Sequence, residues 1–454
     1  MKGNSSYCMV RKIFTILLTF LILCLTACND QTAETSASTS KTEQTETTTT
    51  ATQTSETTFS TQESLSSETT TEKTEIPEIP KGYEIPVALQ DKIIQKGNPT
   101  FIELPSRILF SHYLNSGKWV GDRYQIDSGR YLSYYSKADG EVYINCFDPL
   151  CEHEDCSANG GAMGPNSFFI RNRFYMLINY EGQMLSFNFD GTDTKVEYVL
   201  EDDSLAWKSN NIAYDKYIFI QTLLSNGEKH TFRYDVETKA MEDLTEKTGN
   251  YIEPWFVYNG VIYGYNADGL SIKTDLDLSY EEETEYLYGK AFYDLVSGHR
   301  LIGVAHGDES NTDGFSSYIG IQTYDMKTGT ATLISNETIG KEVSQILYAD
   351  ENYYYFLADD QIYIGKSRSN HDMYNNYGGK IYRVNRDGTN CICIYDNKGM
   401  TFNSMIVYED TVIVSASEIG VHGGIAQTWA NGMYIGTINE DGTINSLEWV
   451  EVIA

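Results

Sequence analysis

The sequence predicts an all-β fold: a β-propeller, most simply of seven four-stranded blades, preceded by a signal peptide and a disordered Thr/Ser/Glu-rich linker. Three observations predict it. Beyond the first 27 residues, no stretch shows a sustained helical period with caps. Short alternating strands recur instead, with an Asp- and Gly-rich turn between them. Aligned on the turn Asp, these units repeat at roughly 40 to 60 residues, which is the period of propeller blades.

The composition supports folded β structure and argues against nucleic acid as a partner. The 454 residues include 35 Tyr and 18 Phe, and aromatic residues favour strands. Acidic residues outnumber Lys and Arg by 64 to 33, which gives a formal net charge of −31. Because phosphate binding needs Lys and Arg to replace counterions, we expect no nucleic-acid partner.

Residues 1–27 predict an export signal. They carry three basic residues and no acidic one, and the apolar run at 13–25 is short for a membrane span of about 20 residues. The run ends in Leu-Thr-Ala-Cys28, which resembles the lipobox of bacterial lipoproteins. The resemblance implies cleavage before Cys28, lipidation of that residue and anchoring on the extracytoplasmic face of the cell membrane. A plain signal anchor with a chance Cys is the alternative.

Residues 28–78 predict a disordered tether that follows the lipidated Cys. From Gln31 to Glu75, 18 of 45 residues are Thr and 8 are Ser, with almost no large apolar side chains. Such a segment buries too little surface to offset the entropy of ordering it. Pro77 and Pro80 then mark the domain edge, so the propeller is expected to span 79–454.

Seven strand–turn units predict seven blades, with six or eight as alternatives because blade edges are not fixed by the pattern. The clearest unit spans 380–395, where apolar and polar positions alternate on both sides of a tight Asp-Gly turn. An array of β-sandwiches is the main alternative fold. The turn residues of the seven units are Asp148, Asp190, Asp235, Asp275, Asp325, Asp387 and Asp441.

The stretch Ile-Tyr-Arg-Val-Asn-Arg-Asp-Gly-Thr at 381–389 and its weaker copies resemble the propeller blades of bacterial surface lipoproteins. They resemble more distantly those of low-density lipoprotein receptor-related proteins. The resemblance covers most of residues 100–450. The Tyr-Trp-Thr-Asp signature of the receptor blades is absent, so a receptor-like function does not carry over. Members of the bacterial group mostly have no established activity.

Long loops of the last three blades hold the first candidate site. With strands A to D in each blade and the Asp turn between C and D, the B–C connections lie on the opposite face. We expect long ones at 305–317, 365–379 and 417–432, clustered because the blades are neighbours. The candidate ligand-binding residues are His306, His371, Asp372, Tyr374, Tyr377, His422 and Trp429.

Two chemistries fit these loop residues. Three His with nearby carboxylates would bind zinc or another divalent metal, or the same groups would form a polar ligand site with Tyr and Trp as stacking faces. The alternative is that each His is a separate, solvated loop residue.

A second candidate site is the Cys-rich segment 146–156, which resembles a segment of lipoproteins in this propeller group. Three thiolates and one imidazole satisfy tetrahedral zinc, which would be structural because a closed site leaves no open position. A disulfide is equally reasonable outside the cytoplasm. The third alternative is that these residues form neither a metal site nor a disulfide. We expect the segment to replace the C–D turn of the first blade. Its candidate residues are Cys146, Cys151, His153 and Cys156.

The sequence contains no familiar catalytic motif, neither Gly-x-Ser-x-Gly nor His-Glu-x-x-His. The leading interpretation is therefore a non-catalytic, lipid-anchored extracytoplasmic protein that binds a glycan, a peptide or an envelope protein. The alternative is an extracytoplasmic carbohydrate-active enzyme, a hydrolase or lyase, with an acidic or His-bearing pocket. A third interpretation is an assembly platform without a small ligand.

Overall fold

The computed structural model describes the residues 84–95, 100–113, 118–120, 123–125, 130–145, 167–171, 173–178, 183–188, 192–199, 206–207, 211–224, 227–284, 291–310, 316–366, 370, 372–375, 378–422 and 425–450. Every described residue belongs to one compact unit, Glu68–Ala454. The predicted signal peptide and tether, 1–27 and 28–78, lie outside the described residues. No helix in the described part is long and apolar enough to cross a membrane.

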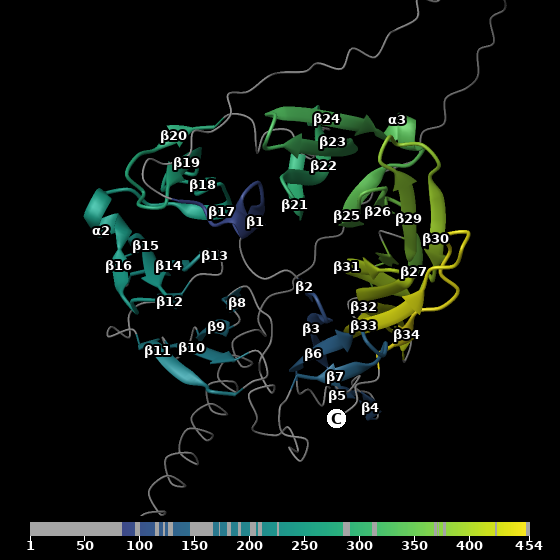
Figure 1. Ribbon diagram of the computed structural model, residues 1–454. Coiled ribbons are helices and arrows are strands. Elements are labelled where there is room, and N and C mark those ends of the chain that lie inside the picture. Colours follow the sequence, from purple (N-terminus) through teal and green to yellow (C-terminus); the bar gives the residue numbers. More distant parts are fainter. Residues whose placement is uncertain are drawn as a thin grey trace, which may run out of the picture. The chain divides into compact units, whose positions relative to one another are not determined.

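Seven antiparallel sheets follow one another along the described part of the chain and form the blades of a β-propeller (Figure 1). The prediction of an all-β propeller with seven mostly four-stranded blades is confirmed. Blade 1 comprises β2 (Phe101–Leu104), β3 (Arg107–Tyr113), β6 (Arg130–Ser136) and β7 (Val142–Ile144). Blade 2 comprises β8 (Ser167–Ile170), β9 (Arg173–Ile178), β10 (Gln183–Asn188) and β11 (Lys195–Val199). Blade 3 comprises β12 (Ala206–Trp207), β13 (Ile212–Tyr214), β14 (Tyr217–Leu223), β15 (Lys229–Asp235) and β16 (Met241–Asp243).

The remaining four blades follow the same order. Blade 4 comprises β17 (Glu253–Tyr258), β18 (Val261–Tyr265), β19 (Ser271–Asp275) and β20 (Glu282–Glu283). Blade 5 comprises β21 (Ala291–Ser297), β22 (Arg300–Ser310), β23 (Ser316–Asp325) and β24 (Thr330–Ser335). Blade 6 comprises β25 (Val343–Ala349), β26 (Tyr353–Ala358), β29 (Lys380–Asn385) and β30 (Ile392–Asp396). Blade 7 comprises β31 (Met400–Tyr408), β32 (Thr411–His422), β33 (Ile425–Thr437) and β34 (Glu448–Trp449).

Short elements complete the described fold. They are the 3₁₀ turn η1 (Val87–Leu89), the strand β1 (Ile93–Gln95), the hairpins β4 (Lys118–Val120)–β5 (Arg123–Gln125) and β27 (Ile362–Lys366)–β28 (Asp372–Asn375), and the helices α2 (Leu244–Thr248) and α3 (Asn336–Ile339). Each helix is a single turn with a side-chain cap. The carboxylate of Asp243 accepts from the backbone N–H of Glu246 at the start of α2, and Gly249 ends it in the left-handed region.

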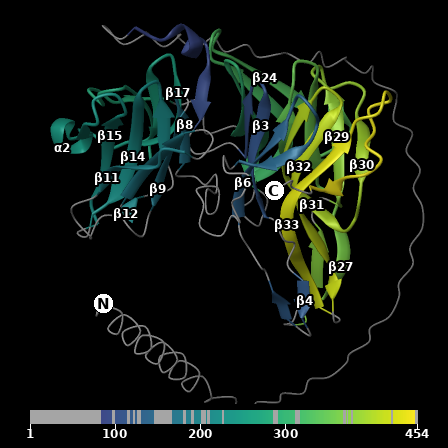
Figure 2. The ribbon, with the colours of Figure 1, turned by 60° about the horizontal axis from the view of Figure 1, so that its bottom comes forward.

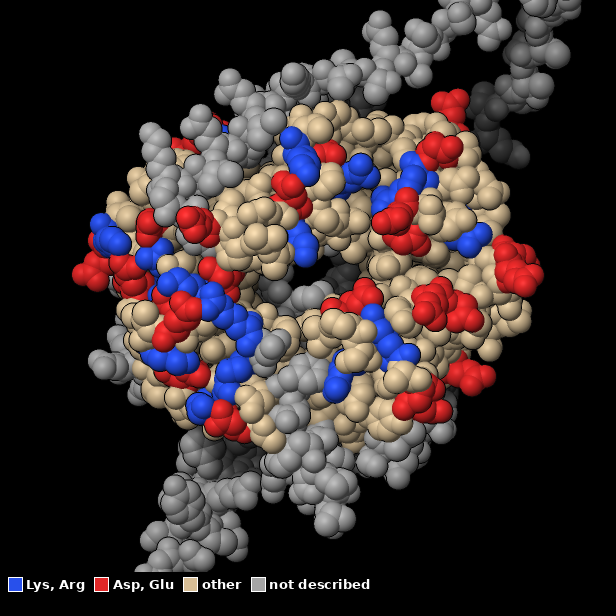
Figure 3. Space-filling model, in the orientation of Figure 1, with Lys and Arg blue, Asp and Glu red and all other residues tan. Residues whose placement is uncertain are grey.

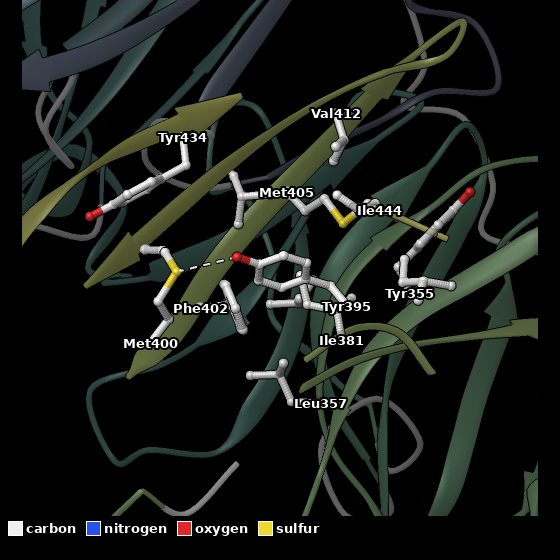
Figure 4. Packing of buried hydrophobic residues seen from close by; sticks show 14 residues of the cluster. Tyr355, Leu357, Ile381, Tyr395, Met400, Phe402, Met405, Val412, Tyr434 and Ile444 are labelled. Carbon is white, nitrogen blue, oxygen red and sulfur yellow. Dashed lines mark hydrogen bonds between the residues drawn. The ribbon is translucent and has the colours of Figure 1, made fainter. Parts of the chain in front are cut away.

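Apolar clusters fill the interfaces between successive blades, including the seventh and the first. Leu357 of blade 6 and Phe402 of blade 7 share one cluster (Figure 4). Phe110 of blade 1 shares another with Ile413 of blade 7 and Phe174 of blade 2. Strands in the middle of a blade are covered on both faces, so they are buried almost continuously rather than in alternation.

The first and last blades are each built from consecutive strands. Among the described strands, β2, β3, β6 and β7 form one sheet and β31 to β34 another, with no exchange between them. The ring therefore closes through side-chain packing between β3 and β33, rather than through a shared sheet.

The turns between the third and fourth strands share one hydrogen bond. In each of the six that the structure describes, an Asp carboxylate accepts from the backbone N–H two residues further on. These residues are Asp139, Asp235, Asp275, Asp325, Asp387 and Asp441. Asp190 lies outside the described residues.

The predicted turn of the first blade is wrong by one strand. The segment 142–148 contains the fourth strand, β7, and the turn Asp is Asp139 rather than Asp148. Gly140 follows at φ +79°, a conformation that glycine adopts without strain. The error arose because the residues of β7 alternate as regularly as those of a third strand.

This correction also moves the Cys-rich segment. It follows β7 and is the connection from blade 1 to blade 2, not a C–D turn. In an antiparallel blade, the second and fourth strands run in the same direction, so this connection starts from the edge that carries the B–C hairpins. Cys146, Cys151, His153 and Cys156 themselves lie outside the described residues, so their disulfide, metal or free state stays a prediction.

The strand β1 comes before blade 1 but belongs to blade 4. It pairs antiparallel with β17, with Ile93 opposite Tyr258 and Gln95 opposite Phe256. Ile93 is buried in the cluster between blades 4 and 5, and its N–H donates to the carbonyl of Gly298 in blade 5. The beginning of the domain therefore holds two blades together in the middle of the chain.

Candidate functional site

The B–C connections of blades 5, 6 and 7 are extended hairpins rather than loops. In blades 5 and 7 the paired strands β22–β23 and β32–β33 run on beyond the rest of the sheet. In blade 6 the separate hairpin β27–β28 is inserted between β26 and β29. The long connections were predicted; their regular β structure was not.

Blade 1 carries a fourth hairpin that the sequence analysis did not predict. The strands β4 and β5 pair between β3 and β6, which are the second and third strands of that blade. Figure 2 shows β4 and β27 extending from the same side of the propeller. We call this side, with the hairpins of blades 1, 5, 6 and 7, the B–C face.

The structure describes three of the seven predicted ligand-binding side chains. His306 lies on β22, and Asp372 and Tyr374 lie on β28. His422 and Trp429 are in β32 and β33, but their side chains are outside the described part, as are His371 and Tyr377 entirely. Convergence of the three His therefore stays a prediction. No group of three or more metal-ligating residues occurs among the described residues.

His306 sits against an aromatic ring at the edge of the B–C face. It lies opposite Tyr318 of β23, and the two ring centroids are 5.3 Å apart. Burial lowers the pKa of His306 below its ordinary value. The imidazole is therefore neutral at pH 7, as a stacking or hydrogen-bonding group would be.

One exposed face of the hairpin β27–β28 carries two cross-strand pairs. Tyr363 lies opposite Tyr374, with their ring centroids 5.7 Å apart in an edge-to-face arrangement. Lys366 lies opposite Asp372, with Nζ and a carboxylate oxygen 3.2 Å apart. Tyr363 is 52% exposed and Tyr374 is 49% exposed. We call these four residues the Tyr–Tyr/Lys–Asp platform.

All four platform residues share one face of the hairpin. Tyr374 and Asp372 are two positions apart on a strand, and such residues point to the same side. A bulge between Tyr363 and Gly365 keeps Lys366 opposite Asp372. Tyr363 and Lys366 were missed by the sequence analysis because only the register reveals their partners.

A buried amide fixes the base of this hairpin. Asn375, which is 1% exposed, donates from its side chain to the carbonyl of Met400 at 2.8 Å and to that of Lys398 at 3.3 Å. Both acceptors belong to the start of blade 7, and β27 also packs against β32 and β33. The hairpin is thus held by the neighbouring blade as well as by its own.

Two glycines let the chain leave the hairpin in close contact with its surroundings. Gly378 and Gly379 have φ values of +60° and +70°. A Cβ on Gly378 would lie 2.6 Å from the carbonyl oxygen of Asp360, and one on Gly379 would overlap that of Asn397. Neither position accepts a side chain without a shift of the backbone.

The start of the hairpin is fixed by a charged cluster. Asp360 accepts a hydrogen bond from the Tyr382 hydroxyl at 2.7 Å and pairs with Lys380 at 3.3 Å. The Tyr382 hydrogen bond, with help from Lys380 and Lys341, lowers the pKa of Asp360 and outweighs the opposing effect of burial. Both ends of the insertion are therefore tied to the propeller.

The opposite face, made of A–B and C–D turns, differs in character. Its charged side chains pair between blades: Arg171 of blade 2 with Asp215 of blade 3 at 3.0 Å, and Arg233 of blade 3 with Asp277 of blade 4 at 2.7 Å. Figure 3 shows Lys and Arg interspersed with Asp and Glu on this face, without a large patch of one sign. These pairs connect blades to one another.

Comparisons with known proteins find only distant likeness to solved structures. No family model matches the sequence, and no curated protein does. A post-proline cleaving enzyme from Rickettsia typhi is 11% identical, with 64% of this chain and 53% of that chain covered and a TM-score of 0.35. The β-propeller domain of the Trilobed protease from Pyrococcus furiosus is 9% identical over 75% of this chain and 94% of that one, with a TM-score of 0.36.

A putative TolB from Agrobacterium tumefaciens is 11% identical, with 63% of this chain and 79% of that chain covered and a TM-score of 0.25. The chain spans about half the length of the first enzyme named. At these identities and TM-scores, the likeness says nothing about the ligand or activity of this chain.

Proposed function

We propose that the chain is a lipid-anchored, extracytoplasmic binding protein that presents the B–C face of its propeller to a ligand or partner. The observation that carries this proposal is the Tyr–Tyr/Lys–Asp platform. It exposes two large aromatic rings on an insertion that is tied to the propeller at both ends.

Two physical points support a binding role for the platform. An isolated two-stranded hairpin is marginally stable in water at best, so β27–β28 depends on Asn375 and on its contacts with blade 7. Tyr rings supply large contact areas with little conformational freedom to lose on binding. A rigid aromatic surface of this kind is suited to recognition and adds nothing to the inter-blade core.

The membrane anchor is supported by the sequence alone. The basic start, the short apolar run and the lipobox-like end at Cys28 motivate it. We expect the native chain to remain with the membrane fraction of producing cells and Cys28→Ser to appear in the medium. The same membrane retention for both would contradict lipidation at Cys28.

Crosslinking on intact cells tests the binding face. We would compare native chain, Tyr363→Ala/Tyr374→Ala, and Tyr280→Ala as a control, since Tyr280 is an exposed Tyr that follows the C–D turn of blade 4. We expect crosslinked species with the native chain and the control, and their loss with the double variant. Equal crosslinking by all three would contradict binding through this hairpin. Turnover of a captured ligand would instead favour the enzyme interpretation.

A further inference from the structure

We propose that the Tyr–Tyr/Lys–Asp platform binds a neutral oligosaccharide, with sugar rings packed on Tyr363 and Tyr374 and sugar hydroxyls bonded to Lys366 and Asp372. This inference rests on the proposed function and names the ligand class for the same face.

The aromatic pair matches one side of a sugar ring. A pyranose carries C–H groups on one face, and an exposed phenol ring offers a flat apolar surface of similar size with a polar hydroxyl at its tip. Tyr363 and Tyr374 meet edge to face at 5.7 Å, so their two ring planes differ by 67°. Two aromatic surfaces with different tilts suit the successive rings of a bent oligosaccharide better than they suit a single flat ligand.

The Lys366–Asp372 pair is suited to the hydroxyl groups at the edge of the same sugar ring. Tyr374 and Asp372 are two residues apart on a strand, which is about 7 Å along the sheet, close to the breadth of one hexose. Lys offers only donors and a carboxylate offers only acceptors, whereas each sugar hydroxyl both donates and accepts. Lys366 and Asp372 are half-exposed, so they keep hydrogen-bonding capacity beyond their own contact.

Charge favours a neutral ligand over an ionic one. The ammonium and the carboxylate are 3.2 Å apart and largely cancel each other, so the platform offers no net charge to a phosphate or to a charged peptide. The chain as a whole carries −31, which repels anionic polymers and lipid surfaces. A polyhydroxylated, uncharged molecule needs no net charge on the platform and is not repelled by the negative charge of the chain.

Pre-organisation supports useful affinity. The buried Asn375 amide and the crowded Gly379 hold the hairpin before any ligand arrives. Binding then has little backbone order to create, and the conformational cost of association falls accordingly.

The test is calorimetric titration of the full mature chain with neutral hexasaccharides of glucose, of xylose and of N-acetylglucosamine, each up to about 10 mM. At least one should bind the native chain. Tyr374→Ala should weaken it about tenfold, Tyr374→Phe should stay within about threefold because the ring remains, and the control Tyr280→Ala should bind like the native chain. Asp372→Asn should weaken binding while leaving the fold intact.

Two results would overturn the proposal. One is no binding of any neutral hexasaccharide, and the other is binding that Tyr374→Ala leaves unchanged. The proposed function fails separately. If cell-surface crosslinking still depends on Tyr363 and Tyr374 while no sugar binds, the face recognises a peptide or protein and only the ligand class is wrong. If neither assay responds to these Tyr residues, both proposals fall.

Discussion

Replacing Asn375 tests whether the hairpin β27–β28 is held from blade 7. The side-chain amide makes two hydrogen bonds across the blade boundary, to the carbonyls of Met400 and Lys398. Asn375→Ala removes both donors and leaves a small void. Asn375→Asp keeps the shape but cannot donate, and it sets a carboxylate against two carbonyl oxygens.

The magnitude follows from the number of bonds and from burial. Each hydrogen bond contributes about 0.5–1.5 kcal/mol net, and a buried carbonyl left without its donor adds to the loss. Asn375→Ala should therefore lower the free energy of unfolding by about 2–3 kcal/mol. Asn375→Asp should lower it further at pH 7, because a buried unpaired charge costs more than a missing amide.

Urea unfolding measures both values, and amide hydrogen exchange of 362–375 shows whether the hairpin loosens. Asn385→Ala is the matched control, since Asn385 lies in the same blade and its amide makes an exposed bond to Thr389. We expect that variant to lose less than about 1 kcal/mol. Native-like stability and unchanged hydrogen exchange in Asn375→Asp would refute the inference that Asn375 holds the hairpin β27–β28 to blade 7.

Three further predictions concern the rest of the propeller. Phe110→Ala at the seam of blades 7 and 1 should lower the free energy of unfolding, measured with urea, by about 3–5 kcal/mol. A loss of less than about 1 kcal/mol would mean that this packing does not close the ring. Ile93→Ala should cost about 2–4 kcal/mol and expose β1 to limited proteolysis, and unchanged protease resistance would contradict its role between blades 4 and 5. Glu197 is 5% exposed, and although burial raises its pKa, hydrogen bonds from Lys239 and from two hydroxyls hold the pKa below 4.5. The ionised carboxylate therefore stabilises the fold above about pH 4.5 and stabilises it less at lower pH. Glu197→Gln should be less stable than the native chain at pH 7, and the difference in unfolding free energy should shrink as the pH falls below about 4.5. A difference that is independent of pH would contradict this role of the carboxylate.

Much of the fold was predictable because propeller turns leave a local signal. An Asp that accepts from the backbone N–H two residues further on needs only its own turn, so Asp235, Asp325 and Asp387 were found from sequence alone. Blade 1 shows the limit of this signal. Its fourth strand alternates as well as a third strand does, and the pattern does not tell Asp148 from Asp139.

The candidate site was less predictable because its geometry depends on non-local contacts. Asp372 and Tyr374 were named from their place in a long connection, but Tyr363 and Lys366 gain their partners only through the bulged register. The attachment of this hairpin to blade 7 depends on the side chain of Asn375, which donates to carbonyls 23 and 25 residues further along the chain. No local pattern distinguishes such an Asn from a solvated one.

The strand β1 also joins parts of the domain that lie far apart in the sequence. Asp91, just before it, donates from its backbone N–H to the side chain of Asn259, 168 residues away. Packing of consecutive blades involves closer parts of the chain, except at the seam of blades 7 and 1. Docking of β1 needs a contact of high sequence separation, and we expect such a contact to form slowly. Until then, the inner strand of blade 4, β17, has an unpaired edge that other strands can join. We therefore expect the first strand of the domain to complete its middle blade late and, on docking, to remove a site of mispairing.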